Sequence, residues 1–519
     1  MTPSWPKIKK ISIQFQGRTN TVLSLLIIGV IALSLRLYYF PYDVPLVLDA
    51  LNAYFLYAND VSILGHLPTN FSVANNGWPV FLSFFFSIFH FNNYLDYMIL
   101  QRIVSVVLSV LTIIPVYLLC NKFVSKPYSL AGAAIFAFEP RIIQNSVLGI
   151  TEPLYFFLLT FTLVLFFSPH TKIRYLSFGI AALTSLVRAE GLFLFIALSV
   201  LYFILEKKNA KIIGRYSIAV IIFLLVILPM AYLRIQAMGY DGLTSNFNAG
   251  VHNTTLFSYQ KGSGVTGVIL FVIEGIENYF KYLGWVMIPI FVFFVPIGIF
   301  LMKKQNRNLL MILVLIIILS LPPLYAYAMG IQETRYLYIL YPLFCVISIF
   351  TIKSFVEKFK RHNMVLTLVI GGILLSSISF LDIKKTDYEH QREAFSLAQK
   401  IVRIASATND YYPEDSYLVP AQIPEKWPVL SSSVKFHAMT ISTAGFDSLN
   451  KYIESSESKG LTHLIVDGGK NRPNFLNDVF YHDEKYPYLV KVFDSEDSGY
   501  KYHLKVYSID YNKFDQYDK

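Results

Sequence analysis

The stretch ILQRIVSVVLSVLTIIPVYLLC, residues 99–120, decides how this chain must fold. It places a single charged side chain, Arg102, among long apolar ones. About 20 mainly apolar residues in a helix are long enough to cross the hydrocarbon core of a bilayer. A helix also satisfies its backbone polar groups within the segment, which the water-free core requires. The stretch therefore predicts a transmembrane helix.

Similar apolar segments recur along the first 381 residues. The full set of candidate spans is 22–40, 99–120, 128–138, 153–167, 175–187, 190–205, 216–235, 284–302, 308–328, 336–352 and 363–381. Two further apolar segments, 78–91 and 265–283, are short or interrupted by polar residues, which is typical of interfacial or re-entrant helices. We therefore expect a mostly α, polytopic membrane protein with about 11 transmembrane helices.

The composition separates a membrane domain from a polar tail. Of the 519 residues, 55% are hydrophobic and 15% are charged, whereas soluble proteins carry about 25% charge. Residues 1–381 hold 27 Lys and Arg against 13 Asp and Glu, a net charge of +14; residues 382–519 hold 17 against 21, a net charge of −4. The excess of basic residues lies mostly in short loops between spans, so it indicates membrane topology and not a nucleic-acid partner.

The tail, residues 382–519, is predicted to be a small soluble α/β domain. Helical periodicity covers 388–407 and 447–458, and short β-rich runs occur at 417–419, 461–466, 489–493 and 502–508.

Lysine and arginine also indicate the orientation. They cluster in the loops 121–126, 168–174, 206–215, 303–307 and 353–362, whereas residues 41–98 contain neither. Since basic loops stay in the cytosol, the N-terminus is predicted to be cytosolic and the tail external. The protein is then a multi-pass protein of the cell membrane, with membrane lipids around it and an external first loop at 41–98.

Ionisable residues beside membrane spans are functional candidates, because placing them there is costly. On the external side they are Arg36, Asp49, Asp60, Arg102, Glu139, Arg141, Glu152, Arg188, Glu190, Arg234, Glu333 and Arg335. This topology predicts that they lie near one external membrane surface, where they could share one cavity.

Each main candidate also has a purely structural interpretation. Asp49, between apolar residues, suits a general base poised by desolvation or the cap of a helix beginning at Ala50. Asp60 is suited to a solvated position, to capping a helix or to lining the substrate pocket. Glu152 follows Thr151, a predicted helix cap, and precedes a proline suited to a first turn.

The two arginines are similarly open to two interpretations. Arg188 is placed to form an internal salt bridge with Glu190 or to bind substrate. Arg335 suits an interface anchor or a bidentate phosphate ligand. The sequence contains no Walker loop, dinucleotide fingerprint, HExxH or G-x-S-x-G motif, and its two cysteines lie in apolar spans. No cofactor is expected and no metal site is assigned; the sequence leaves a requirement for a divalent metal open.

An ordered series of motifs resembles the GT-C glycosyltransferases, in particular the group of protein O-mannosyltransferases and lipid A aminoarabinose transferase. The series spans roughly residues 20–350 and comprises LRLYYF (35–40), Asp49, ILGHLP (63–68), NGWPVF (76–81), QRIVS (101–105), TEPL (151–154), LVRAEG (186–191) and ETRYLYILYP (333–342).

This resemblance implies a donor sugar linked to polyprenyl or dolichyl phosphate, moved with inversion onto a protein, lipid or glycan on the non-cytosolic face. Asp49 would be the general base, and Arg335 and Arg188 would bind the donor phosphate. Glu152, Asp60 and Arg102 would line the acceptor and donor pocket. The family's Asp-Glu pair is here Asp49-Ala50, which leaves the acceptor class open.

Other features limit or compete with this interpretation. The tail lacks both the Trp-Trp-Asp-type motif of oligosaccharyltransferase catalytic subunits and a β-trefoil repeat. A polytopic transporter, which usually shows paired halves, and an O-antigen ligase or polymerase-like protein remain alternatives.

Overall fold

The computed structural model describes residues 16–46, 50–69, 73–91, 94–206, 211–409, 439–467 and 473–517. Contacts group the chain into two compact units. The first comprises residues 1–40, 64–84 and 101–385, and the second comprises 41–63, 85–100 and 386–519.

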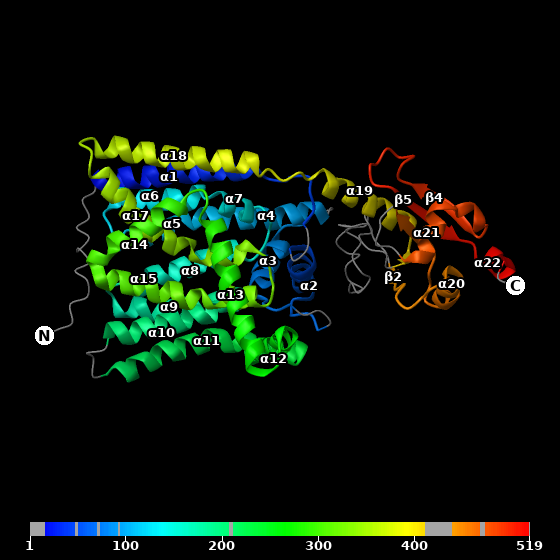
Figure 1. Ribbon diagram of the computed structural model, residues 1–519, viewed down its shortest axis with the longest axis horizontal. Coiled ribbons are helices and arrows are strands. Elements are labelled where there is room, and N and C mark those ends of the chain that lie inside the picture. The colour runs from blue at the N-terminus through cyan, green and yellow to red at the C-terminus, as the bar shows by residue number, and fades with distance from the viewer. Residues whose placement is uncertain are drawn as a thin grey trace. The chain divides into compact units, whose positions relative to one another are not determined.

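The first unit is built almost entirely of helices (Figure 1). Those up to residue 206 are α1 (Gln16–Tyr38), α3 (Gly77–Ile88), α4 (Tyr94–Leu111), α5 (Ile113–Cys120), α6 (Lys126–Phe138), α7 (Pro140–Ser146), α8 (Glu152–Phe166), α9 (Thr171–Val187) and α10 (Gly191–Glu206). Those that follow are α11 (Ile212–Met238), α12 (Thr244–Lys261), α13 (Gly264–Met287), α14 (Phe291–Met302), η2 (Lys303–Gln305), α15 (Asn306–Leu319), α16 (Leu321–Ala328), η3 (Thr334–Leu340), α17 (Tyr341–Val356) and α18 (His362–Ile383).

Most of these helices run side by side as a bundle, whereas α13 runs steeply across it (Figure 1). The pair α12 and α13 is bent by 101° at a short break, the geometry of a broken span or a re-entrant loop. Residues 265–283, predicted to be interfacial or re-entrant, lie within α13.

Every predicted span lies largely in helices, with breaks such as residues 288–290 within the segment 284–302, but the number of spans is not confirmed. Within the described residues, six helices are long and apolar enough to cross a membrane, or seven if the bent pair is one span. Helices such as α6, α8 and α10 contain only 13, 15 and 16 residues. They fall short of the roughly 20 residues that span a bilayer, so the count of 11 remains a prediction.

Arg36 is a structural residue of the bundle. Its side chain is completely buried, and its Nη1 donates to the carbonyls of Ala32 at 2.9 Å and Ala137 at 3.1 Å. Nε and Nη2 donate to the Ser109 hydroxyl at 3.2 and 3.0 Å. A buried charge is stable only when it is hydrogen-bonded in this way, so Arg36 ties α1 to α4 and α6.

The second unit contains the tail. Its elements are η1 (Ala50–Phe55, a π-helical turn), α2 (Leu56–Leu64), α19 (Glu389–Ile404), β1 (Ala407–Asn409), β2 (Met439–Ile441), α20 (Leu449–Glu457), β3 (His463–Asp467), α21 (Asn474–Tyr481), η5 (Asp483–Lys485), β4 (Leu489–Asp494), β5 (Leu504–Ile509) and α22 (Tyr511–Tyr517). Strands β3, β5 and β4 form an antiparallel sheet in that order, and β1 pairs with β2 in parallel.

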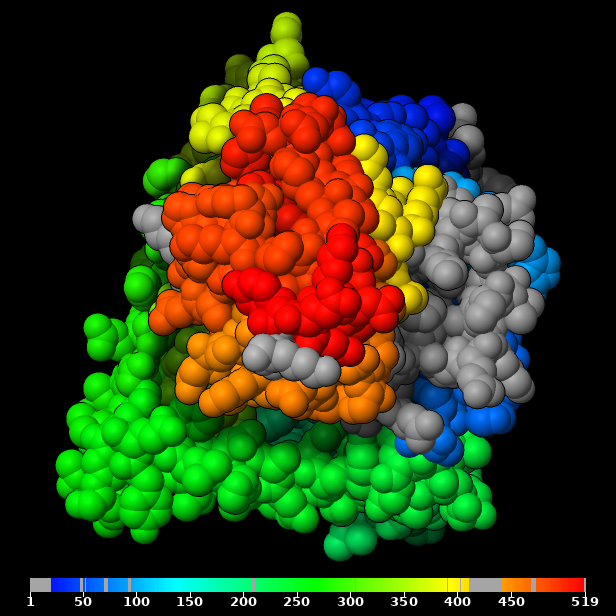
Figure 2. Space-filling view, turned by 90° about the vertical axis from the view of Figure 1, so that its right-hand side faces the viewer, coloured from blue at the N-terminus to red at the C-terminus, as the bar shows by residue number. Residues whose placement is uncertain are grey.

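The sheet has its own hydrophobic core, in which Tyr452, Leu464 and Tyr507 are almost fully buried. Figure 2 shows the surface of this part in orange and red. The helices and strands predicted from the sequence correspond to α19, α20, β3, β4 and β5; that the tail is a soluble domain remains a prediction. The run predicted at 417–419 lies outside the described residues.

Candidate functional site

Glu152 opens α8 and is 2% exposed. Pro153 occupies the first turn of the helix, as predicted, since a helix needs no N–H there. The predicted cap by Thr151 is wrong, because its side chain makes no capping hydrogen bond. The Thr151 hydroxyl instead donates to Glu152 Oε2 at 3.2 Å and accepts from Arg188 Nη1 at 3.1 Å.

Side chains of two other helices, α3 and α4, hold the turn before Glu152 in place. Gly149 adopts a φ of 76°, a left-handed conformation that glycine accepts without strain. Its carbonyl accepts hydrogen bonds from Trp78 Nε1 at 3.3 Å and from Gln101 Nε2 at 2.6 Å. Both donor side chains are completely buried. The position of Glu152 is therefore fixed by α3 and α4 as well as by its own helix.

Arg188 lies in the tight turn between α9 and α10. Its Nη1 donates to Glu152 Oε1 at 2.7 Å, and its Nη2 donates to Glu190 Oε1 at 2.6 Å. The guanidinium also lies 5.9 and 5.7 Å from the ring centres of Tyr155 and Tyr336. The predicted salt bridge with Glu190 is present, and Glu152 is a second partner that the sequence did not identify.

Arg335 approaches the same carboxylate from η3. Its Nε forms an ion pair with Glu333 and lies 3.9 Å from Glu152 Oε1. Glu152 therefore lies between two guanidinium groups from different parts of the chain.

These side chains line one pocket with an empty volume of about 230 Å³, its open mouth included. Its lining residues are Glu152, Tyr155, Phe156, Arg188, Glu190, Arg335, Tyr336 and Ile339. Two arginines held in fixed orientations suit an anionic ligand, because a guanidinium binds phosphate or carboxylate oxygens in a bidentate manner. Tyr155 and Tyr336 add aromatic surface beside the two arginines. The sequence does not predict either tyrosine as a site residue.

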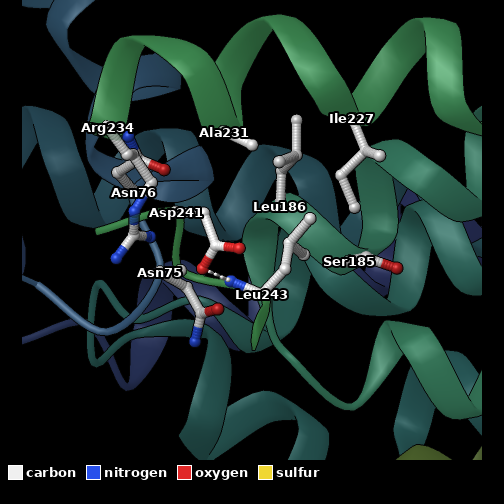
Figure 3. A pocket seen from close by; sticks show the side chains of 10 residues that line it. Asn75, Asn76, Ser185, Leu186, Ile227, Ala231, Arg234, Asp241 and Leu243 are labelled. Carbon is white, nitrogen blue, oxygen red and sulfur yellow. Dashed lines mark hydrogen bonds between the residues drawn. The ribbon is translucent and has the colours of Figure 1, made fainter. Parts of the chain in front are cut away.

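The expectation of one shared cavity is met by only some of the predicted residues. Glu139 and Arg141 pair at 3.7 Å, and Arg141 Nη2 donates to the Trp285 carbonyl at 2.6 Å. Arg102 is buried in α4 and does not line the pocket. Arg234 lines a different pocket, between α9 and α11 (Figure 3).

The two aspartates of the first loop have different outcomes. Asp49 lies outside the described residues; the helix expected to begin at Ala50 does begin there, as η1. Asp60 is 4% exposed and lies inside α2, in the second unit. The expectation that Asp60 is solvated or caps a helix is therefore wrong, and its part in a substrate pocket remains a prediction.

The pocket residues do not suit a divalent metal. Among the residues that the structure describes, no group of three or more His, Cys, Asp or Glu side chains is placed to hold an ion. Glu152 and Glu190 both point their oxygens at the Arg188 guanidinium, whose charge opposes a cation at the same place.

No family model and no curated protein matches the sequence. The structure is similar to the oligosaccharyltransferase of Archaeoglobus fulgidus solved with Zn and sulfate, with a TM-score of 0.56 and 13% identity over 86% of this chain and 68% of that one. AglB from the same organism, in complex with an inhibitory peptide and a dolichol-phosphate, gives a TM-score of 0.56 and 12% identity over 88% and 70%.

A third structure of the A. fulgidus enzyme, tethered to an acceptor peptide containing the NVT sequon, gives a TM-score of 0.51 and 14% identity over 86% and 69%. These similarities show that the chain shares its fold with the A. fulgidus oligosaccharyltransferase. They give no support to the narrower group of O-mannosyltransferases and aminoarabinose transferase.

Proposed function

We propose that this chain is a membrane glycosyltransferase that moves a sugar from a polyprenyl-phosphate donor to an acceptor on the non-cytosolic face. The observation that carries the proposal is the convergence of Arg188 and Arg335 on one pocket, within a fold shared with oligosaccharyltransferases. The dolichol-phosphate bound to AglB supports a lipid-linked donor.

In the proposed reaction, Asp49 takes the proton of the acceptor nucleophile as that atom attacks the anomeric carbon. The bond from that carbon to the donor's phosphate oxygen breaks, and its electron pair leaves with the phosphate. Attack from the face opposite the leaving group inverts the configuration. Asp49 enters by the family resemblance alone.

Arg188 and Arg335 would stabilise the negative charge that develops on the departing phosphate. Glu152 would act as a positioning residue, since its Oε1 accepts from Arg188 at 2.7 Å and lies 3.9 Å from Arg335 Nε. Groups already held in position need no reorganisation as the charge forms.

The acceptor class follows from two opposing observations. The acceptor peptide bound by the A. fulgidus enzyme supports a protein acceptor. The absence of a Trp-Trp-Asp-type motif from residues 382–519 weighs against transfer to the same peptide motif. We therefore keep protein, lipid and glycan as acceptor classes to be distinguished by product analysis.

The decisive experiment is a profile of lipid-linked sugars in cells with and without the gene. Deletion should cause one polyprenyl-phosphate-linked sugar to accumulate and one glycosylated product to disappear. Wild-type protein should restore both, as should the control Lys353→Arg at a half-buried position of α17, whereas Arg335→Lys should not restore them fully. An unchanged profile after deletion would remove the glycosyltransferase proposal and favour a transporter.

A further inference from the structure

A second pocket lies between the C-terminal ends of α9 and α11 and the start of α12. Its empty volume is about 250 Å³, its open mouth included. The pocket is lined by Asn75, Asn76, Ser185, Leu186, Ile227, Ala231, Arg234, Asp241, Gly242 and Leu243. In the view of Figure 3 the polar side chains of Asn75, Asn76, Arg234 and Asp241 gather toward one end.

Two residues that line this pocket each have a buried polar atom without a hydrogen-bond partner in the described part of the chain. Asn76 is 1% exposed; its Nδ2 donates to Met230 Sδ at 3.1 Å, but its Oδ1 accepts no hydrogen bond. Arg234 is 4% exposed; its Nη1 and Nη2 donate to the carbonyls of Ala74 at 3.0 Å and Val73 at 3.1 Å, but its Nε has no acceptor. A buried polar group without a hydrogen-bond partner destabilises the fold, so we expect both atoms to be satisfied by a group that enters the pocket.

The two atoms specify the chemistry of what enters. Asn76 Oδ1 needs a donor, and Arg234 Nε needs an acceptor. A hydroxyl group is both, because it has one O–H and two lone pairs. Partial burial raises the pKa of the Asp241 carboxyl, but hydrogen bonds from Thr244 and from three backbone N–H groups outweigh that effect and hold the pKa well below its usual range. Asp241 is therefore negatively charged and disfavours an anion in the pocket.

We infer that this pocket is a carbohydrate subsite, in which Asn76 and Arg234 hold a hydroxyl of a sugar ring that lies at the mouth. The part of the pocket that a water-sized group can enter is only about 10 Å³, so it takes one hydroxyl of a larger ligand and not the whole ligand. Leu186 and Ile227 provide apolar surface for the ring's C–H groups. The inference rests on the proposed function for the source of the sugar, which is the glycan being transferred.

Through α9, the chain connects this subsite to the pocket lined by Arg188 and Arg335, hereafter the arginine pocket. Leu186 lines the carbohydrate subsite, and Arg188, two residues later, lines the arginine pocket. Gly77, next to Asn76, packs so closely on this segment that a Cβ would lie 2.6 Å from the Leu186 carbonyl carbon. The phosphate of one donor would therefore bind in the arginine pocket, and its sugar would bind in the carbohydrate subsite on the other side of the end of α9.

The test measures the thermal stability of the purified full chain with methyl glycosides of glucose, mannose and N-acetylglucosamine, and with inorganic phosphate. A ligand that binds only the folded state raises the melting temperature, by an amount that grows with the logarithm of its concentration relative to its dissociation constant. We expect at least one glycoside to raise it in the wild type. Asn76→Leu and Ala231→Leu, which remove the acceptor or fill the pocket, should abolish that shift.

Ala237→Leu, on the same helix but outside the pocket, is the matched control and should keep the shift. An equal glycoside shift in all four proteins would show a general co-solvent effect, and the absence of any glycoside shift in the wild type would show that water alone satisfies the pocket. Either result overturns the inference, and so does a phosphate shift lost in Ala231→Leu. If one variant fails to fold, the other still decides.

The same data separate this subsite from the proposed function. Loss of the phosphate shift in Arg335→Lys with the glycoside shift intact supports two neighbouring subsites. A pocket-dependent glycoside shift in cells whose lipid-linked sugars do not change on deletion would leave the subsite standing and remove the glycosyltransferase proposal.

Discussion

Replacing Asp49 by Asn separates the two roles that its sequence context allows. Asn caps a helix about as well as Asp, whereas loss of a cap costs about 1 kcal/mol, so a capping role predicts nearly normal folding and activity. A general base contributes about 10²–10⁴-fold in rate. We expect normal expression and donor binding, with turnover reduced at least about a hundredfold in a transfer assay.

Asp60→Asn is the parallel variant in this assay. It should keep its turnover, with some loss of stability because Asp60 is buried in α2. Full activity of Asp49→Asn together with an inactive Asp60→Asn would transfer the catalytic role to Asp60.

Arg335→Lys tests the donor phosphate. Lysine keeps the charge but loses the planar fork, and a hydrogen bond to a charged group contributes about 1.5–3 kcal/mol. We expect donor affinity or turnover to fall by about tenfold or more. The conservative change Arg361→Lys, at an exposed position before α18, should have no effect. Wild-type kinetics in Arg335→Lys would return Arg335 to the role of an interface anchor.

At the scale of single residues, the sequence predicts which residues belong to the site better than it predicts the contacts that they make. Glu152, Arg188 and Arg335 were predicted from the cost of placing charge beside a membrane, and the structure brings all three together. The role of Thr151 was misassigned because a hydroxyl beside a guanidinium has a charged partner that a local pattern does not reveal. Asn76 carries no charge, so a search for ionisable residues beside membrane spans does not find it.

Among the elements, the contact between the start of α3 and the end of α9 leads to a stability prediction. In Gly77→Ala the new Cβ would lie 2.6 Å from backbone atoms of Leu186 and 2.8 Å from the Val187 nitrogen. Backbone cannot rotate away as a flexible side chain can, and overpacking typically costs about 1–3 kcal/mol. We expect a lower melting temperature in detergent and weaker transfer, because both pockets use this end of α9.

Gly371→Ala provides the control for this change. Gly371 lies in α18, and nothing is within 4 Å of an added Cβ. Alanine has the higher helix propensity, so the melting temperature should stay the same or rise slightly. Equal destabilisation by both substitutions would contradict the close packing at Gly77.

Helix positions followed from apolar length, whereas helix breaks did not. The segment 284–302 was predicted as one span, yet α13 ends at Met287 and α14 begins at Phe291. Hydrophobicity is continuous across this break, so it carries no signal for where a helix changes direction. The steep course of α13 depends on packing between distant segments, such as its contact with α16.

For the whole molecule, the alternation of basic loops predicts an orientation that labelling can check. Cysteines introduced at Lys10 and at the exposed Lys451 should respond differently to a membrane-impermeant thiol reagent on intact cells. We expect labelling at 451 and not at 10. The two native cysteines, Cys120 and Cys345, are buried and should give no background. The opposite pattern would invert the topology and place the proposed chemistry in the cytosol.

The division of the chain into two compact units differs from the division that the sequence predicts. Charge and composition indicated a polar tail after residue 381, but residues 41–63 and 85–100 group with that tail. This grouping arises from contacts across hundreds of residues, and composition averaged along the chain does not detect them.

The shared carbonyl of Gly149 has a consequence for how this protein can change over generations. Trp78 and Gln101, 71 and 48 residues away, both donate to that one oxygen. Losing either donor leaves the other to hold the turn alone, so a lineage that replaces one is under selection to keep its companion or to rebuild the turn. Among orthologues, Trp78, Gln101 and Gly149 should therefore be inherited as a set, with drift at one position accompanied by drift at the others.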